Sequence, residues 1–221
     1  MLFDWDIIVE YLPIFIQGFF NTIKISIISL IFSIILGLIG AFCRISKNKV
    51  LNTLASIYVN AFRSTALLAQ LYLLYFGLPY IGIYLTAFTT GVISLSLAEG
   101  AYITEIIRSG IQSVPKEQTE AALSLGMKPN TLMYLIILPQ AFFIFLPPLI
   151  GQTARLVMAS SLFSIIAYDE IIRAAGTVAA YSFAPSEAYL TAAFLYFIIC
   201  YSLLKFSTYL ESKKKKTILP K

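Results

Sequence analysis

The sequence has 221 residues, of which 59% are hydrophobic and 12% are charged, and it carries a formal net charge of +5. Its mean hydropathy of +0.84 is too high for a soluble domain of ordinary composition, which indicates an integral membrane protein. At roughly 20 residues per membrane-spanning helix, the chain has room for about five or six spans, which excludes a large soluble domain.

The positive charges cluster at the ends of apolar segments, where lysine and arginine mark the cytoplasmic side of a membrane protein. No basic stripe interleaved with aromatic residues is present, so we expect no nucleic-acid partner. The sequence contains no histidine, and its two cysteines, Cys43 and Cys200, lie inside apolar segments. We therefore expect no metal site, no catalytic residue and no disulfide framework.

The first predicted span covers Ile25 to Cys43 and has no charged residue. Gly37 and Gly40 within it are small enough to allow close contact with another helix. Positive residues follow its inner end, namely Arg44, Lys47 and Lys49. This pattern places the N-terminus outside the cell.

A second span is predicted as one helix from about Leu54 to Leu74, with Arg63 near the inner interface or facing the protein interior. The third predicted span, Ile83 to Arg108, is apolar except for Glu99 and Glu105. Glu105 and Arg108 are three residues apart on this helix, so they are expected to pair near the inner face.

The charged segment after the third span predicts a cytoplasmic loop, at about residues 112–130, with a short amphipathic helix from Lys116 to Leu125. Gly126 is suited to the left-handed conformation that ends a helix, and Pro129 is suited to the first turn of the next. The loop therefore predicts two helices that meet at a sharp bend.

The fourth predicted span runs from Pro129 to about Leu146, where Pro147 and Pro148 are expected to end or kink it. The segment 150–184 is too polar for a simple span, and we predict that it re-enters the membrane partway beside a translocation path. A last span from Tyr189 to Thr208 is followed by four lysines, Lys213 to Lys216, which place the C-terminus inside. The predicted fold is thus an all-α integral membrane protein, a single domain over 1–221 with five spans.

Ionisable residues inside a membrane are candidates for function, because burying them is costly. Glu99 is the strongest candidate for contact with a substrate ammonium group, although an ion pair with Arg155 that merely satisfies both charges is an alternative. Arg155 and Gln152 follow the proline pair, and a guanidinium there can hold a carboxylate with two hydrogen bonds. Ser160 and Ser161 either line the same path or permit helix packing.

The cytoplasmic loop carries a specific motif: Glu120-Ala121-Ala122, then Gly126 after three residues, and then Ile136 and Leu138-Pro139. This spacing resembles the EAA signature of ABC-importer permeases. The segments 63–71, 75–79 and 101–111 further resemble the polar amino acid uptake branch, and the resemblance covers nearly the whole chain.

The resemblance implies a multi-pass permease of the bacterial inner membrane that moves amino acids into the cell. It implies a dimer with a second copy or a paralogue, ABC ATPase subunits that contact a coupling helix, and an extracytoplasmic binding protein that delivers the substrate. It assigns ATPase coupling to Glu120, Ala121, Ala122 and Gly126. The chain departs from the family pattern at three positions: Ala66 replaces a usual proline, Glu117 a glycine, and Met158 a lysine near the expected path.

The sequence contains no Gly-x4-Gly-Lys-Ser/Thr phosphate loop, so this chain is not expected to hydrolyse ATP itself. We expect it to bind no cofactor, with ATP and Mg²⁺ held by the partner ATPase. The alternative function is an ATP-independent channel or a membrane scaffold. Such a protein has no use for Glu120 and Gly126 at this spacing, which favours the importer.

Overall fold

The computed structural model describes the backbone of residues 5–218 and the side chains of residues 6–210. The described chain is helical apart from short turns. Its elements are α1 (Trp5–Glu10), α2 (Leu12–Ile45), α3 (Lys49–Arg63), α4 (Leu67–Tyr72), the π-helix η1 (Leu73–Gly77), the 3-10 helix η2 (Leu78–Ile81), α5 (Ala87–Gln112), α6 (Lys116–Ser124), α7 (Pro129–Leu132), the π-helix η3 (Met133–Ile137), α8 (Leu138–Ala159), the 3-10 helix η4 (Ser160–Ile166), α9 (Ile171–Ser182) and α10 (Pro185–Ile218).

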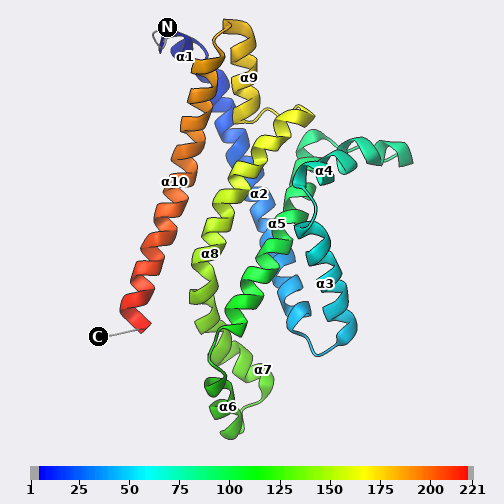
Figure 1. The fold of residues 1–221 in the computed structure, drawn as a ribbon, viewed down its shortest axis with the longest axis vertical. Helices are drawn as coiled ribbons and strands as arrows, with labels where there is room; N and C mark the ends of the chain where they lie inside the picture. Colours follow the sequence, from blue (N-terminus) through cyan, green and yellow to red (C-terminus); the bar gives the residue numbers. More distant parts are fainter. Residues whose placement is uncertain (1–4, 219–221) are drawn as a thin grey trace.

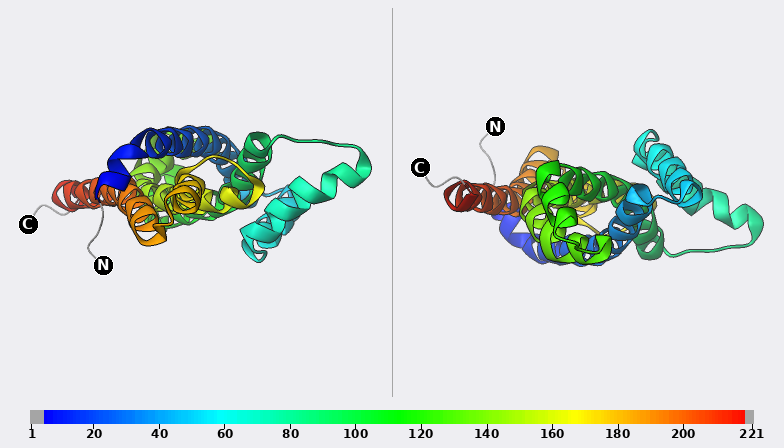
Figure 2. Two further views of the ribbon diagram at one scale, coloured as in Figure 1. Left: turned by 90° about the horizontal axis from the view of Figure 1, so that it is seen from above. Right: turned by 90° about the horizontal axis from the view of Figure 1, so that it is seen from below.

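The long helices α2, α5, α8 and α10 run along the long axis of the molecule, with α6 and α7 at one end and α1 and α9 at the other (Figure 1). Seen along this axis, α10 lies at one edge and the α3–α4 pair at the opposite edge (Figure 2). Helix α5 packs against α2, α3 and α8. It is therefore the central helix of the bundle.

Glycines bring α2 very close to α5. A Cβ atom at Gly37 would lie 2.3 Å from Cγ2 of Ile103, and one at Gly40 would lie 2.3 Å from Oγ1 of Thr104. Both distances are far below a van der Waals contact, so any larger residue would push the helices apart. The prediction that these glycines allow close helix contact is confirmed.

Three described helical stretches are long and apolar enough to cross a membrane, and their bounds are Leu12–Ile45, Pro129–Ile166 and Pro185–Leu210. The pair Lys49–Arg63 and Leu67–Ile81 provides a fourth if its two bent parts form one span. Helix α5 does not meet the same criterion, and it carries buried polar residues such as Ser94, Ser96 and Thr104. Because neighbouring helices enclose it, α5 needs less apolar surface than a helix that faces lipid.

The first span is longer than predicted, since α2 begins at Leu12 instead of near Ile25. Several polar residues in the added part find partners elsewhere in the fold. The side-chain amide of Asn21, for example, donates a 2.7 Å hydrogen bond to the backbone carbonyl of Asp169. Polar residues in this part of the sequence therefore do not end the helix.

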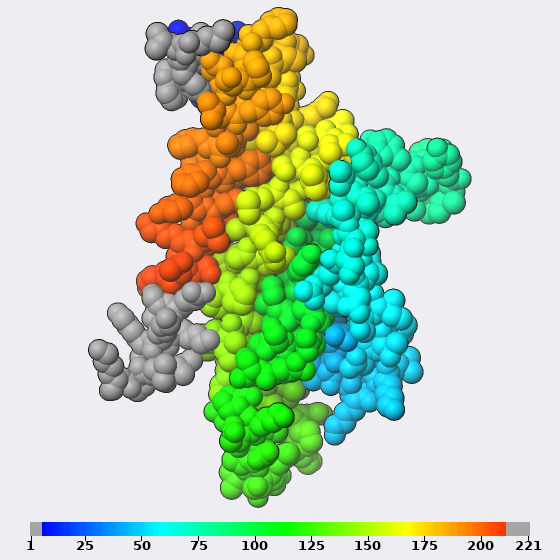
Figure 3. Space-filling model, in the orientation of Figure 1, coloured from blue at the N-terminus to red at the C-terminus, as the bar shows by residue number. Residues whose placement is uncertain are grey.

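The predicted single helix from Leu54 to Leu74 is wrong, because α3 ends at Arg63 and the chain turns by 100° before α4. Side chains bond the carbonyl groups that a continuous helix would have used. Thr65 Oγ1 donates to the carbonyl of Ala61 at 2.7 Å, and Gln70 Nε2 donates to the carbonyls of Phe62 and Thr65 at 3.1 and 3.2 Å. The segment 67–81 consequently projects from the bundle as an arm (Figure 3).

The proline pair does not end the fourth span, since α8 continues through Pro147 and Pro148 to Ala159. The carbonyl of Pro147 accepts a 3.0 Å hydrogen bond from Ser207 Oγ of α10. The first part of the segment predicted to re-enter the membrane is therefore the second half of α8. The last predicted span lies within α10, but the side chains of Lys213 to Lys216 fall outside the described residues.

The helix and the turn predicted within the loop 112–130 agree closely with the structure. Helix α6 covers Lys116–Ser124, Gly126 is left-handed with φ of +78°, and Pro129 stands in the first turn of α7. The loop is thus two short helices joined at a glycine turn.

Candidate functional site

Glu99 lies in the middle of α5, and only 6% of its surface is exposed. Its carboxylate accepts a 2.5 Å hydrogen bond from Nε2 of Gln152 on α8. The other end of the same amide, Oε1 of Gln152, accepts a hydrogen bond from Nη2 of Arg155. A carboxylate, an amide and a guanidinium thus form one continuous chain between α5 and α8.

Tyr102 follows Glu99 by about one helical turn, so it faces the same side of α5. The guanidinium of Arg155 lies 5.4 Å from the centre of its ring, and that of Arg63 from α3 lies 5.3 Å from it. Both distances are within the range of cation–π attraction. The ring therefore holds two positive groups near a single buried carboxylate.

These side chains border a cavity of about 260 Å³ between α3, α5 and α8. Its walls combine charged and polar groups with apolar ones: Phe62, Thr65, Leu67, Ala98, Glu99, Tyr102, Gln152, Arg155, Ala159 and Leu162. A mostly apolar pocket with a few convergent polar groups is the usual form of a small-molecule site. Both charges needed to hold a zwitterion, one negative and one positive, are on its wall.

Three of the five residues predicted for the substrate path meet in this cavity, namely Glu99, Gln152 and Arg155. The direct ion pair considered for Glu99 and Arg155 is replaced by the bridge through Gln152. Ser160 and Ser161 are not among the lining residues. Their hydroxyl groups donate to the carbonyls of Val157 and Met158 in the preceding turn, which favours their alternative role in helix packing.

Sequence reasoning did not name Phe62, Thr65 or Tyr102 as residues of the path, although all three line the cavity. The spacing of Tyr102 from Glu99 was a usable signal, because residues three apart share a helix face. Phe62 and Thr65 lie at the break between α3 and α4. They reach the cavity through a bend that the sequence prediction did not include.

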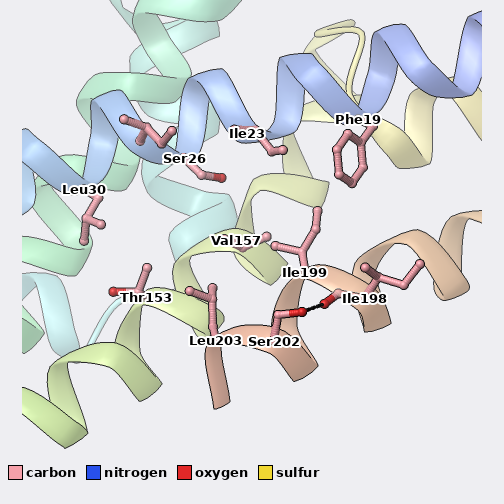
Figure 4. A pocket seen from close by; sticks show the side chains of 11 residues that line it. Phe19, Ile23, Ser26, Leu30, Thr153, Val157, Ile198, Ile199, Ser202 and Leu203 are labelled. Atoms are coloured by element: carbon pink, nitrogen blue, oxygen red, sulfur yellow. Dashed lines mark hydrogen bonds between the residues drawn. The ribbon is translucent and has the colours of Figure 1, made fainter. Parts of the chain in front are cut away.

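A larger groove of about 470 Å³ lies between α2, α8 and α10 (Figure 4). Its walls are almost wholly apolar, with residues such as Phe19, Ile199 and Leu203. Buried hydroxyl groups such as that of Ser26 are its polar features, and no charged side chain lines it. The smaller cavity at Glu99 is therefore the better candidate for a charged ligand.

Helix α6 and the glycine turn after it carry the residues predicted to couple transport to an ATPase. Glu120, Ala121 and Gly126 are exposed, as a docking surface requires. Ala122 is only 3% exposed and packs into the apolar cluster that contains Ile107, Ile111 and Leu132. Its side chain thus attaches α6 to the bundle, and its assignment to ATPase coupling stays a prediction.

A second charged group joins helices at the same end of the molecule. Glu105 accepts hydrogen bonds from Arg44 of α2 at 3.3 Å and from Arg108 at 2.6 Å. The predicted pairing of Glu105 with Arg108 is confirmed. Arg44 also donates to Asn52 Oδ1 of α3 at 3.3 Å, so one carboxylate and two guanidiniums connect α2, α3 and α5.

Comparison with known proteins identifies the family. Residues 33–216 match the model of the binding-protein-dependent transport system inner membrane component. The chain belongs to this family. Among its curated relatives is the L-cystine transport system permease protein TcyB of Bacillus subtilis (strain 168), which is 40% identical over 201 residues, covering 90% of this chain and 86% of that one.

Solved structures of two transporters have a similar fold. An amino acid ABC transporter crystallised with histidines matches with a TM-score of 0.92 at 34% identity, over 96% of this chain and 100% of that one. The MetNI methionine ABC transporter, in an inward-facing conformation, matches with a TM-score of 0.75 at 17% identity, over 90% and 95%. The resemblance to an amino acid ABC-importer permease that the EAA motif indicated is confirmed.

Proposed function

We propose that this permease moves amino acids through the membrane along a path that includes the cavity at Glu99, Gln152 and Arg155. The observation that carries the proposal is the arrangement of a buried carboxylate and a guanidinium on facing helices around one small cavity. Free amino acids carry both an ammonium and a carboxylate. A site with both opposite charges matches that pattern, whereas an apolar cavity does not.

In this proposal the substrate ammonium binds Glu99 and the substrate carboxylate binds Arg155. Without substrate, the amide of Gln152 occupies both groups, which keeps a buried carboxylate hydrogen-bonded. The substrate would replace the Gln152 amide as the hydrogen-bond partner of both Glu99 and Arg155. The apolar wall formed by Phe62, Leu67 and Leu162 would then face the substrate side chain.

The proposed topology has five spans: α2, the bent pair of α3 with 67–81, α5, the continuous stretch 129–166, and α10. The turn between α2 and α3 lies at the same end of the molecule as α6 (Figure 1), and positive residues surround it, among them Arg44, Lys47 and Lys49. Because such residues favour the cytoplasmic side, this end is assigned to the cytoplasm. The N-terminus is then outside and the C-terminus inside.

The partners follow from this orientation. ABC ATPase subunits, which would hold ATP and Mg²⁺, dock on the exposed face of α6 around Glu120. A second permease subunit, a copy or a paralogue, covers the arm 67–81, whose exposed apolar residues include Leu73, Tyr80 and Ile81. An extracytoplasmic binding protein delivers the amino acid at the opposite end, and the location is the bacterial inner membrane.

Reconstitution tests the proposal. The permease is purified as a complex with its ATPase subunits. This complex is placed in vesicles together with the binding protein. Uptake of labelled amino acids is then measured with and without ATP, in competition with a panel of cationic, neutral and acidic amino acids. We expect ATP-dependent uptake and competition by one class. Uptake that needs neither ATP nor an ATPase subunit would contradict the importer and support a channel.

A further inference from the structure

Helix α6 is held to the bundle at two places of different character. The first is the buried side chain of Ala122, which packs among apolar residues. Such packing is not directional, so it sets the distance of α6 from the bundle more strictly than its rotation. The second place is a hydrogen bond, which is directional.

The hydrogen bond joins Gln118 of α6 to Gln140 in the first turn of α8. Nε2 of Gln140 donates to Oε1 of Gln118 at 2.5 Å and to the carbonyl of Ile136 at 3.0 Å. A side-chain amide has two N–H donors, so both donors of Gln140 are engaged. We refer to the contact between Gln140 and Gln118 as the glutamine bridge.

The bridge connects α6 directly to α8. The backbone between Gln118 and Gln140 is much longer than this contact. From Gln118 to Gln140 the backbone passes through the turn at Gly126, then α7, and then the π-helix η3. The helices α7 and η3 continue into α8 as one helical stretch, so the backbone route bends at the turn of Gly126, whereas the hydrogen bond between side chains on α6 and α8 acts across one contact. The first turn of α8 is thus in direct contact with α6.

Helix α8 also carries the residues of the candidate substrate cavity. Gln152 lies 12 positions after Gln140 on the same helix, a distance of roughly 18 Å at about 1.5 Å per residue. Glu120, the exposed acidic residue of the docking surface, lies two positions after Gln118. The bridge therefore lies between the docking surface and the helix that carries Gln152 and Arg155.

We propose that the glutamine bridge is the positioning contact that transmits movement of α6 to α8, so that Gln118 and Gln140 determine how much transport each ATP drives. This inference rests on the proposed function of α6 as the docking helix. Its specific claim is that the bridge fixes the rotation of α6 relative to α8. Loss of the bridge should leave the docking surface present but poorly coupled.

The test measures amino acid uptake per ATP hydrolysed, in vesicles that contain the permease, its ATPase subunits and its binding protein. Gln140→Leu and Gln118→Leu each replace an amide by an apolar side chain of similar size, which removes the bridge. We expect each to lower the ratio by about fivefold, the factor to which one neutral hydrogen bond corresponds, while ATP hydrolysis continues. Gln17→Leu, an exposed glutamine on α2 at the other end of the molecule, serves as the control and should keep the ratio.

A designed replacement separates transmission from simple stability. The double variant Gln118→Glu with Gln140→Lys substitutes an ion pair for the bridge, and we expect it to recover at least half of the lost ratio. Unchanged ratios in both leucine variants would overturn the inference, as would a double variant no better than the single ones. If Gln140→Leu fails to retain the ATPase subunits, Gln140→Asn is used, which keeps the amide but shortens its reach.

The same measurements distinguish this inference from the proposed function. A wild-type complex without ATP-dependent uptake contradicts the importer itself. A wild-type complex that couples normally, together with leucine variants that also couple normally, contradicts only the glutamine bridge.

Discussion

The side-chain amide of Gln152 donates a 2.5 Å hydrogen bond to the carboxylate of Glu99, which joins the middle of α5 to α8. Both side chains are buried, so the contact lies away from bulk water. A buried carboxylate without a full counter-charge is costly. Its presence in the central helix therefore suggests a use in function over one in stability.

We predict that Glu99→Gln weakens recognition of the substrate ammonium. The loss of one charge-assisted hydrogen bond should raise the substrate concentration for half-maximal uptake by about 10- to 100-fold. The measurement is ATP-dependent uptake in vesicles with a cationic, a neutral and an acidic amino acid. The matched control is Asp169→Asn, because that carboxylate is 71% exposed and lies outside the cavity. Identical uptake of all three classes by Glu99→Gln and wild type would remove Glu99 from the site.

Glu105 connects two helices, since it pairs with Arg44 of α2 and with Arg108 of α5. Its side chain is only 16% exposed, so these two ion pairs are intermediate between fully exposed pairs and fully buried ones. We expect Glu105→Gln to lower the free energy of unfolding by about 1–3 kcal/mol, because two guanidiniums would remain without their counter-charge. Thermal unfolding in detergent measures the change.

The control for this prediction is the ion pair of Arg173 with Asp169, whose side chains are 44% and 71% exposed. Exposed pairs contribute little to stability. Arg173→Gln should therefore leave the unfolding temperature nearly unchanged. Equal effects of the two substitutions would mean that burial does not govern the strength of these pairs.

Glu170 gives a pH-dependent prediction. It begins α9, which at 12 residues is too short to span a membrane, and its carboxylate accepts hydrogen bonds from Ile172 N, Arg173 N and Tyr196 Oη at 2.8, 2.8 and 2.7 Å. Burial raises the pKa of Glu170, because desolvation outweighs these hydrogen bonds. The folded state then binds the proton more tightly than the unfolded state.

Stability linked to this proton is present below the unfolded pKa and is lost as the pH rises through the higher folded pKa. Relative to Glu170→Gln, which cannot titrate, the wild type should therefore gain stability as the pH falls from 7 toward 4.5. The difference in unfolding temperature between the two proteins, followed across this range, measures the effect. A difference that is constant, or that changes with the opposite sign, would contradict the raised pKa.

Gly126 ends α6 in the left-handed conformation, with φ of +78°, and an added Cβ would meet nothing within 4 Å. A substitution there is thus penalised through backbone conformation and not through a clash. We expect Gly126→Val to lower uptake per ATP, because a β-branched residue strongly disfavours this conformation. Gly126→Asn should retain more coupling, since asparagine tolerates it. Equal coupling by both variants would mean that the turn does not need this conformation.

The parts of the fold that sequence reasoning predicted well are those governed by local rules. The turn at Gly126, the proline start of α7 and the pairing of Glu105 with Arg108 each depend on residues a few positions apart. The glycine contact of α2 with α5 followed from side-chain size alone. Such features need no knowledge of distant partners.

The parts that were wrong depend on long-range partners. The break after Arg63 is stabilised by Gln70 from the following helix. The carbonyl of Pro147, in the helix that continues past the proline pair, is bonded by Ser207 from α10. In the candidate site, Glu99, Gln152 and Arg155 were predicted as path residues, with a direct ion pair of Glu99 and Arg155 as an alternative. Their connection through the amide of Gln152 required the packing of α5 against α8.

The bend between α3 and α4 has a consequence for how two permease subunits would communicate. Thr65 and Leu67 belong both to the bend and to the wall of the Glu99 cavity, while Gln70 ties the bend to the end of α3. The start of the arm is therefore linked to that wall through the bend. If a second permease subunit covers the arm as proposed, a displacement of the arm would reach the cavity wall at Thr65 and Leu67 through this bend.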